Sequence, residues 1–239
     1  KPMKAARVEA QRAISTFTMA AVEARKLSGD VVPMDASPAG EGKLAFTLRV
    51  PIGVVAAISP FNFPLNLVAH KIAPALAAGC AVVLKPASQT PLSALLLAEL
   101  ETDAGLPPGW LNVLCGPASE IGDVLVEDER VRLISFTGSV GVGWGIRERA
   151  PRKRVSLELG NATPVIVAAD SDLEDVAARL AANAFSFAGQ SCISVQRIYV
   201  ERNAYDRFLE LFLLRVEALQ VGDPADESTD VGPLISQKE

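Results

Sequence analysis

The sequence predicts an α/β fold with a parallel β-sheet, and three observations support this prediction. Apolar residues make up 49% of the 239 residues and charged residues 21%, so a sizeable hydrophobic core is expected. From Pro51 onward, short strand-like runs alternate with helical stretches, as in βαβ units. A second alternation begins near Pro164 and predicts a second α/β unit in the same chain.

The first unit opens on a helix and a turn region. Residues 5–28 carry apolar side chains at helical spacing, and Gly29 supplies a C-terminal stop. A stretch rich in Pro, Gly and Asp follows, after which residues 44–50, LAFTLRV, alternate like a half-exposed strand. Strands are then expected at 53–59, 81–85, 110–115, 131–136 and 154–159, with helices around 65–78, 91–104, 118–126 and 140–149.

The second unit is shorter. We expect a strand from Pro164, a helix over 171–186, a strand over 195–201 and a helix over 203–219. The chain stops in mid-pattern at GPLISQKE, with only two candidate strands in this unit. The sequence is therefore expected to be a fragment of a longer protein.

Composition excludes several classes of function. The net charge is −5 without a long basic run, which argues against a nucleic-acid surface. No apolar stretch reaches the ~20 residues that span a bilayer, and the first residues lack the apolar core of a secretory signal. The three cysteines are far apart and form neither a disulfide framework nor a CxxC metal pair. A reducing, cytoplasmic setting is expected.

The single histidine, His70, limits the chemistry further. One histidine excludes a His-rich metal site, and no metal is expected. Because Leu67, Ile72 and Leu76 lie close to it on the same predicted helix, we expect His70 to be a structural residue. A nucleophilic cysteine in this chain would need a base other than histidine.

Cys192 differs from the other two cysteines in its surroundings. Cys80 and Cys115 lie in the apolar runs LAAGCAVVL and LNVLCGP, whereas Cys192 follows a Gly-Gln-Ser loop and precedes a strand in FAGQSCISVQR. A reactive thiolate needs an accessible position next to hydrogen-bond donors. The position of Cys192 suggests a nucleophile.

Loops at the carboxyl ends of parallel strands are where such sheets bind ligands. In FTGSVGVG, Gly138 permits a tight turn and Ser139 can cap the following helix, whose N-terminus attracts phosphate. The spacing is not GxGxxG, so the common dinucleotide fingerprint is absent. A capped helix without a ligand is an equal alternative.

Lys85 ends an apolar strand and precedes Pro-Ala-Ser-Gln. A cation at this strand end could contact ribose hydroxyls or a phosphate. Alternatively, Lys85 is a solvated lysine that terminates the strand.

Asn62 lies in the stiff turn SPFNFPL between two phenylalanines. Its amide could donate a hydrogen bond to an oxyanion, as side-chain amides do in acyl transfer. It could equally close a local Asx turn.

Glu158 lies in RVSLELG, where an alternation of period two places it on one face with Arg154 and Ser156. This pattern fits a polar face with an Arg–Glu pair. It also fits a partly buried carboxylate, with its pKa raised towards neutrality, that serves as the missing base.

Taken together, the motifs PFNFPL, LKPASQTP, FTGS, LELG and GQSC, in this order, resemble the aldehyde dehydrogenase superfamily across the whole chain. The resemblance implies a doubly wound, Rossmann-like cofactor-binding domain over residues 1–160, with a β-hairpin near 33–50 used in oligomers. Residues 161–239 would begin a catalytic α/β domain. Family members run roughly twice this length, and the motifs place this chain in their middle.

The resemblance also implies a mechanism. Cys192 matches the nucleophile that adds to an aldehyde, and Asn62 matches the amide that holds the oxyanion together with the Cys192 backbone N–H. Hydride then passes to a nicotinamide cofactor and leaves a thioester. Glu158 matches the base that activates water to hydrolyse this thioester, and no histidine or metal is needed.

For the cofactor, the family's motifs imply NAD or NADP. Where many members have a glutamate for the ribose 2′-hydroxyl, this chain has Ser88, which can hydrogen-bond a 2′-phosphate. We therefore expect NADP to be accepted. The implied cofactor-binding residues are Ile58, Ser59, Pro60, Phe61, Lys85, Ser88, Gly138, Ser139, Val142 and Leu159.

The implied substrate is a small aldehyde, and the implied assembly is a homodimer or homotetramer. Asn66, Ser191 and Ile193 would line part of the substrate tunnel, which favours a short polar aldehyde. The wording AGQSCISVQR is closest to members that act on lactaldehyde-like or glyceraldehyde-3-phosphate-like aldehydes. A second departure is Asn161, where a second glycine often follows LELG, and the sequence offers no explanation for it.

Two alternatives stay open. The acylating branch of the family passes the thioester to coenzyme A, although a water-activating Glu158 would waste that thioester. The chain could also be a truncated nucleotide-binding or assembly module without activity.

Overall fold

The computed structural model describes residues 1–162 and 164–237, and the chain divides into two compact units. Each unit has its own β-sheet and its own hydrophobic core. We call them the sheet unit, residues 12–137 and 142–157, and the terminal unit, residues 1–11, 138–141 and those from 158 onward.

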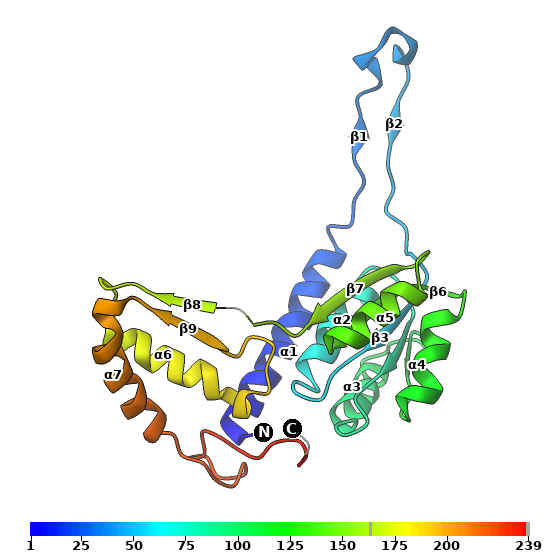
Figure 1. Cartoon of the computed structure of the whole chain (residues 1–239). Helices are drawn as coiled ribbons and strands as arrows, with labels where there is room; N and C mark the ends of the chain where they lie inside the picture. Colours follow the sequence, from blue (N-terminus) through cyan, green and yellow to red (C-terminus); the bar gives the residue numbers. More distant parts are fainter. Residues whose placement is uncertain (163, 238–239) are drawn as a thin grey trace. The chain divides into compact units, whose positions relative to one another are not determined.

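The sheet unit is built around five strands in the order β5-β4-β3-β6-β7. Figure 1 labels β3, β6 and β7 of this sheet. β3 pairs in parallel with β4 on one side and with β6 on the other, and β4 pairs in parallel with β5. The chain thus starts in the middle, moves to one edge, and returns to build the other side, which confirms the doubly wound sheet. The strands are β3 (Val54–Ile58), β4 (Val82–Lys85), β5 (Leu111–Val113), β6 (Val131–Gly138) and β7 (Arg154–Leu159).

A helix connects each strand of this sheet to the next. β3 is a continuous apolar run, VVAAI, because the central strand of a doubly wound sheet is covered on both faces. Val68 and Ile72 of α2 pack with Val55 and Leu84 of the strands in the hydrophobic core. The helices are α2 (Asn66–Ala77), α3 (Leu92–Asp103), α4 (Ala118–Glu127) and α5 (Val140–Arg149).

The region before the sheet is shorter in regular structure than predicted. Helix α1 (Met3–Ala24) ends four residues before the expected position, and the expected strand over 44–50 is reduced to β2 (Ala45–Phe46). β2 pairs antiparallel with β1 (Val31–Val32), and two short 3₁₀ turns, η1 (Met34–Ala36) and η2 (Pro38–Gly40), lie between them (Figure 1).

The terminal unit contains a small parallel sheet and two helices. β8 (Pro164–Val167) pairs with β9 (Arg197–Val200). Helices α6 (Leu173–Phe185) and α7 (Tyr205–Glu217) follow the two strands, and a 3₁₀ turn, η4 (Arg202–Ala204), precedes α7. The order strand, helix, strand, helix is the one predicted. The core of this unit is formed by Val167, Ala177, Leu180, Phe208 and Leu211.

No helix in residues 1–162 and 164–237 is long and apolar enough to cross a membrane.

Candidate active site

The carboxyl edge of the five-stranded sheet contains the topological switch point. β3 is the first strand of the sheet, and its neighbours β4 and β6 belong to the two halves that are built in opposite directions. Ile58, at the end of β3, pairs with Lys85 of β4 and with Phe136 of β6. Open α/β sheets bind ligands in the crevice at this point.

Two buried polar groups lie at this edge. Ser59 is 5% exposed, and its hydroxyl oxygen has no hydrogen-bond partner among the described residues, although its N–H donates to the Lys85 carbonyl at 3.2 Å. Lys85 is also 5% exposed, and its ammonium donates to the Pro86 carbonyl at 3.3 Å. The alternative of a solvated Lys85 is therefore wrong, because the β4 end is covered. An ammonium has three donors, so this edge retains hydrogen-bonding capacity for a polar or anionic ligand.

Hydrogen bonds hold Ser88 in the loop after β4 and Asn62 in the loop after β3. The exposed Ser88 hydroxyl donates to the Gly116 carbonyl at 3.0 Å, and the Asn62 side-chain oxygen accepts from the Phe63 N–H at 3.0 Å. The Asn62 contact reaches the N–H of the next residue, whereas an Asx turn bonds the N–H two residues on. In this contact the side-chain oxygen of Asn62 is the acceptor. Pro60 and Phe61 are half-buried in the same loop.

Sequence reasoning missed a buried lysine beneath this edge. Lys71 of α2 is 6% exposed, and its ammonium donates to the Ser135 hydroxyl at 3.2 Å and to the Thr137 hydroxyl at 2.8 Å. The bonds tie α2 to the end of β6. The available signal was the position of Lys71 next to Ile72, on the apolar face of the predicted helix.

The start of α5 presents several of the predicted cofactor residues. Ser139 and Val142 are exposed, and Gly138 is half-buried at the end of β6. Among the described residues, the Ser139 hydroxyl makes no hydrogen bond, so the predicted capping contact is absent.

Cys192 is exposed on the loop between α6 and β9. Cys80 is buried, but Cys115 is exposed as well, although it lies in an apolar run. Exposure therefore separates Cys192 from Cys80 and does not separate it from Cys115. Asn161 donates from its side-chain amide to the Cys192 carbonyl, and no described residue accepts a hydrogen bond from the Cys192 N–H.

A turn of unusual backbone geometry precedes Cys192. Phe187 and Ala188 have φ values of 52° and 55°, and Gly189 has a φ of 75°. Residues with a Cβ rarely adopt this left-handed conformation, and it costs roughly 1–2 kcal/mol for each. Phe187 is 8% exposed, and the Lys1 ammonium lies 4.9 Å from its ring centroid. Burial and this cation–π contact help to hold the turn.

Side-chain contacts fasten the rest of the loop. The Gln190 side chain donates to the Phe187 carbonyl at 3.0 Å and accepts from the Ile235 N–H at 2.8 Å. The Ser194 hydroxyl, in a residue only 4% exposed, donates to the Ala184 carbonyl at 2.9 Å. The loop that carries Cys192 is therefore anchored on both sides of the cysteine.

Glu158 lies near the end of β7, on the polar face that the alternation predicts. It is exposed together with Arg154 and Ser156, and Leu159 is half-buried on the other face. The predicted partly buried carboxylate is thus wrong in its burial, because β7 exposes its polar face. Asn66 is buried at 1% exposure at the start of α2, whereas Ile193 is 71% exposed and Ser191 is half-buried beside Cys192.

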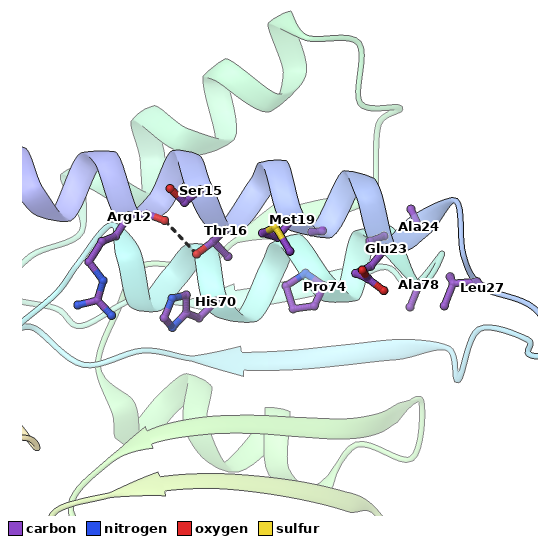
Figure 2. A pocket seen from close by; sticks show the side chains of 12 residues that line it. Arg12, Ser15, Thr16, Met19, Glu23, Ala24, Leu27, His70, Pro74 and Ala78 are labelled. Carbon is purple, nitrogen blue, oxygen red and sulfur yellow. Dashed lines mark hydrogen bonds between the residues drawn. The ribbon is translucent and has the colours of Figure 1, made fainter.

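A groove of about 650 Å³ lies between α1 and α2 (Figure 2). Apolar side chains such as Met19, Leu27 and Pro74 line it, and none of the predicted site residues does. His70 also lines it and is exposed, and its structural role stays a prediction.

A doubly wound sheet with buried polar groups at its switch point is typical of dinucleotide-binding α/β proteins. The profile of the aldehyde dehydrogenase family matches residues 1–239, and the chain belongs to this family. The match confirms the resemblance drawn from the motifs.

Several characterised relatives are similar over the whole chain. A 3-sulfolactaldehyde dehydrogenase of Priestia aryabhattai is 51% identical over 239 residues, which is 100% of this chain and 50% of the relative. A lactaldehyde dehydrogenase of Methanocaldococcus jannaschii is 46% identical over 99% of this chain and 50% of its own length. The chain thus spans about half the length of the curated relatives it matches.

A solved structure agrees in fold. Glyceraldehyde-3-phosphate dehydrogenase GapN from Methanocaldococcus jannaschii, complexed with NADP, superposes with a TM-score of 0.93 and 45% identity. The superposition covers 99% of this chain and 51% of GapN.

Proposed function

We propose that the protein of which this chain is a part oxidises an aldehyde to a carboxylate with NAD or NADP, through a thioester on Cys192. The observation that carries the proposal is the exposed Cys192 on an anchored loop, in a chain that the family profile matches throughout. The proposal is supported by relatives whose names describe aldehyde oxidation.

In the first step, the Cys192 thiolate adds to the aldehyde carbon. A C–S bond forms, and the carbonyl π electrons move to oxygen to give an oxyanion. The Cys192 N–H supplies one hydrogen bond to that oxyanion. We assign the second hydrogen bond to the Asn62 side-chain amide because Asn62 matches the oxyanion-binding asparagine of the family motif. A bound nicotinamide would supply the acceptor for the hydride of this carbon, and the oxyanion would re-form the C=O bond to give a thioester on Cys192.

In the second step, Glu158 removes a proton from water, and the resulting hydroxide attacks the thioester carbon. The C–S bond breaks, and the products are the carboxylic acid and the Cys192 thiolate. Exposure of Glu158 allows the proton to pass on to solvent.

The residues at the sheet edge fit a dinucleotide. Ser59 has a buried hydroxyl with unused capacity, and Lys85 has a buried ammonium with donors to spare, so ribose hydroxyls or a phosphate can be bound there. We assign the backbone and side chains of Ile58, Pro60, Phe61, Ser88, Gly138, Ser139, Val142 and Leu159 to the same cofactor.

Ser88→Glu is expected to shift the cofactor preference towards NAD. A carboxylate at this position repels a 2′-phosphate and accepts from a 2′-hydroxyl, so the ratio of kcat/KM for NADP over NAD should fall roughly tenfold to a hundredfold. Ser119→Glu, an exposed serine in the first turn of α4, adds the same charge elsewhere and should leave the ratio unchanged. If the wild-type kcat/KM is more than tenfold higher with NAD than with NADP, the prediction that Ser88 allows NADP to be accepted is wrong.

For the substrate, we propose a short polar aldehyde, such as a lactaldehyde-like or glyceraldehyde-3-phosphate-like compound. Ser191 and Ile193 flank Cys192 and are the residues of this chain best placed to contact it. A contribution from Asn66 stays a prediction, because that side chain is buried.

We propose that the β1–β2 hairpin joins copies of the protein into a dimer or tetramer. Val31, Leu44 and Phe46 are 74%, 81% and 61% exposed, an apolar surface that association would cover. Phe46→Lys should lower the mass in light scattering, whereas Leu92→Lys, on a leucine of α3 that is 77% exposed, should not. A monomeric wild-type protein contradicts this assignment.

The reducing, cytoplasmic setting stays a prediction.

The full-length protein tests the proposed function directly. Purified enzyme, a panel of short aldehydes and NAD or NADP should give reduced nicotinamide and carboxylate without coenzyme A. Turnover that requires coenzyme A would assign the acylating branch instead. Cofactor binding without reduction by any aldehyde would leave a binding module.

A further inference from the structure

Asn161 stands where a second glycine often follows the LELG motif, and the structure gives it a contact that glycine cannot make. Its side-chain amide donates to the main-chain carbonyl of Cys192. Asn161 lies two residues after the end of β7 and three after Glu158. The hydrogen bond therefore links the segment that follows the proposed base to the loop of the proposed nucleophile, within one unit.

This contact fixes the peptide between Cys192 and Ile193. The carbonyl of that peptide accepts from Asn161, and its N–H lies 3.4 Å from the Ser191 hydroxyl oxygen. Both ends of the peptide are thus held. The orientation of this peptide fixes the Cys192 backbone on its carbonyl side and so restricts the directions available to the thiol and to the Cys192 N–H.

The other anchors of the loop do not contact the Cys192 carbonyl. Gln190 links the turn before Cys192 to Ile235, and Ser194, two residues after Cys192, bonds to the Ala184 carbonyl. Neither contact touches the main chain of Cys192. Among the described residues, the Asn161 amide makes the only hydrogen bond to any atom of the cysteine.

We propose that Asn161 is a positioning residue, which holds the Cys192 loop so that the thiol and the Cys192 N–H face the same carbonyl group. The proposal rests on the proposed function for the chemistry, and on the Asn161–Cys192 contact alone for the order of the loop. Glycine in its place leaves the carbonyl without this donor.

The test uses Asn161→Asp and Asn161→Gly in the full-length protein. Asp keeps the shape and replaces the donor by an acceptor, which repels the Cys192 carbonyl, and Gly removes the side chain. The matched control is Asn112→Asp, because Asn112 on β5 also donates through Nδ2 to a main-chain carbonyl, that of Gly109 at 2.9 Å, and both residues belong to the sheet unit.

Three measurements are made on each variant. Deuterium uptake of peptides that cover residues 186–194 should rise about fivefold to tenfold for both Asn161 variants, the factor expected from the loss of one hydrogen bond. The hydride-transfer rate in the first turnover should fall at least about tenfold, since misplacement by about 1 Å can cost a hundredfold. The Kd of the cofactor should stay within about twofold of wild type, as for any change confined to the Cys192 loop.

The outcomes separate the two proposals. If Asn161→Asp alters neither uptake nor the first-turnover rate more than Asn112→Asp does, the positioning role is overturned. Increased uptake with an unchanged first turnover also overturns it, since the contact would then be structural only. If wild type transfers no hydride, the proposed function fails. Uptake, together with the rate and pH profile of Cys192 alkylation by iodoacetamide, then still decides whether Asn161 orders the loop.

Discussion

Cys192→Ala is expected to lower aldehyde-dependent production of reduced nicotinamide by at least about a thousandfold, because removal of a covalent nucleophile removes the reaction path itself. The first-turnover burst should disappear along with the steady-state rate. Cofactor binding should persist, since the buried Ser59 and Lys85 belong to the sheet unit and not to the Cys192 loop. Stopped-flow absorbance and a cofactor titration measure both quantities.

Cys115→Ala is the control for this variant. Cys115 is a free, exposed thiol like Cys192, so it matches in exposure and differs in position. Its burst should equal that of wild type. If Cys115→Ala loses the burst and Cys192→Ala keeps it, the nucleophile is Cys115 and the proposed mechanism is contradicted.

Glu158→Gln is expected to separate the two chemical steps. Glutamine has the shape of glutamate but cannot accept a proton from water, and a general base contributes about 10²–10⁴-fold. Steady turnover should fall by that factor, while the first-turnover burst keeps most of its amplitude. The acyl group should then remain on the enzyme, and intact-protein mass spectrometry should detect it on Cys192.

Glu148→Gln controls for the loss of one surface carboxylate. Glu148 is exposed on α5, in a helix that follows the predicted cofactor loop, and it should turn over normally. Normal turnover by Glu158→Gln as well would show that another group activates water, or that coenzyme A is the natural acceptor. A lost burst in Glu158→Gln would instead assign Glu158 to deprotonation of the thiol.

The regular elements could be predicted because their signals are local. Helix α5 has the bounds 140–149 expected from the sequence, and β7 has the bounds 154–159, since periodicity and flanking turns lie within each segment. The short β2 was harder to predict. An alternating pattern indicates a strand, but the length of the strand depends on how many residues find a partner. In β2, Ala45 and Phe46 pair with Val32 and Val31 of β1.

The site could be predicted in composition and only partly in environment. Burial of Lys85 and exposure of Cys115 and His70 depend on which distant segments cover them, which a local pattern does not contain. The link from Asn161 to Cys192 spans 31 positions of sequence, so no spacing rule announces it. The family motifs supplied the roles proposed for Glu158 and Asn62.

The left-handed turn at Phe187 and Ala188 has a consequence for the behaviour of the protein on warming. Its backbone conformation is unfavourable and persists because neighbouring contacts enforce it. The free energy needed to open this loop is therefore smaller than the free energy needed to open the sheet. We therefore expect thermal inactivation to precede melting of the fold. The operating temperature limit of the protein would then be set by a nine-residue loop, 186–194, rather than by its hydrophobic cores.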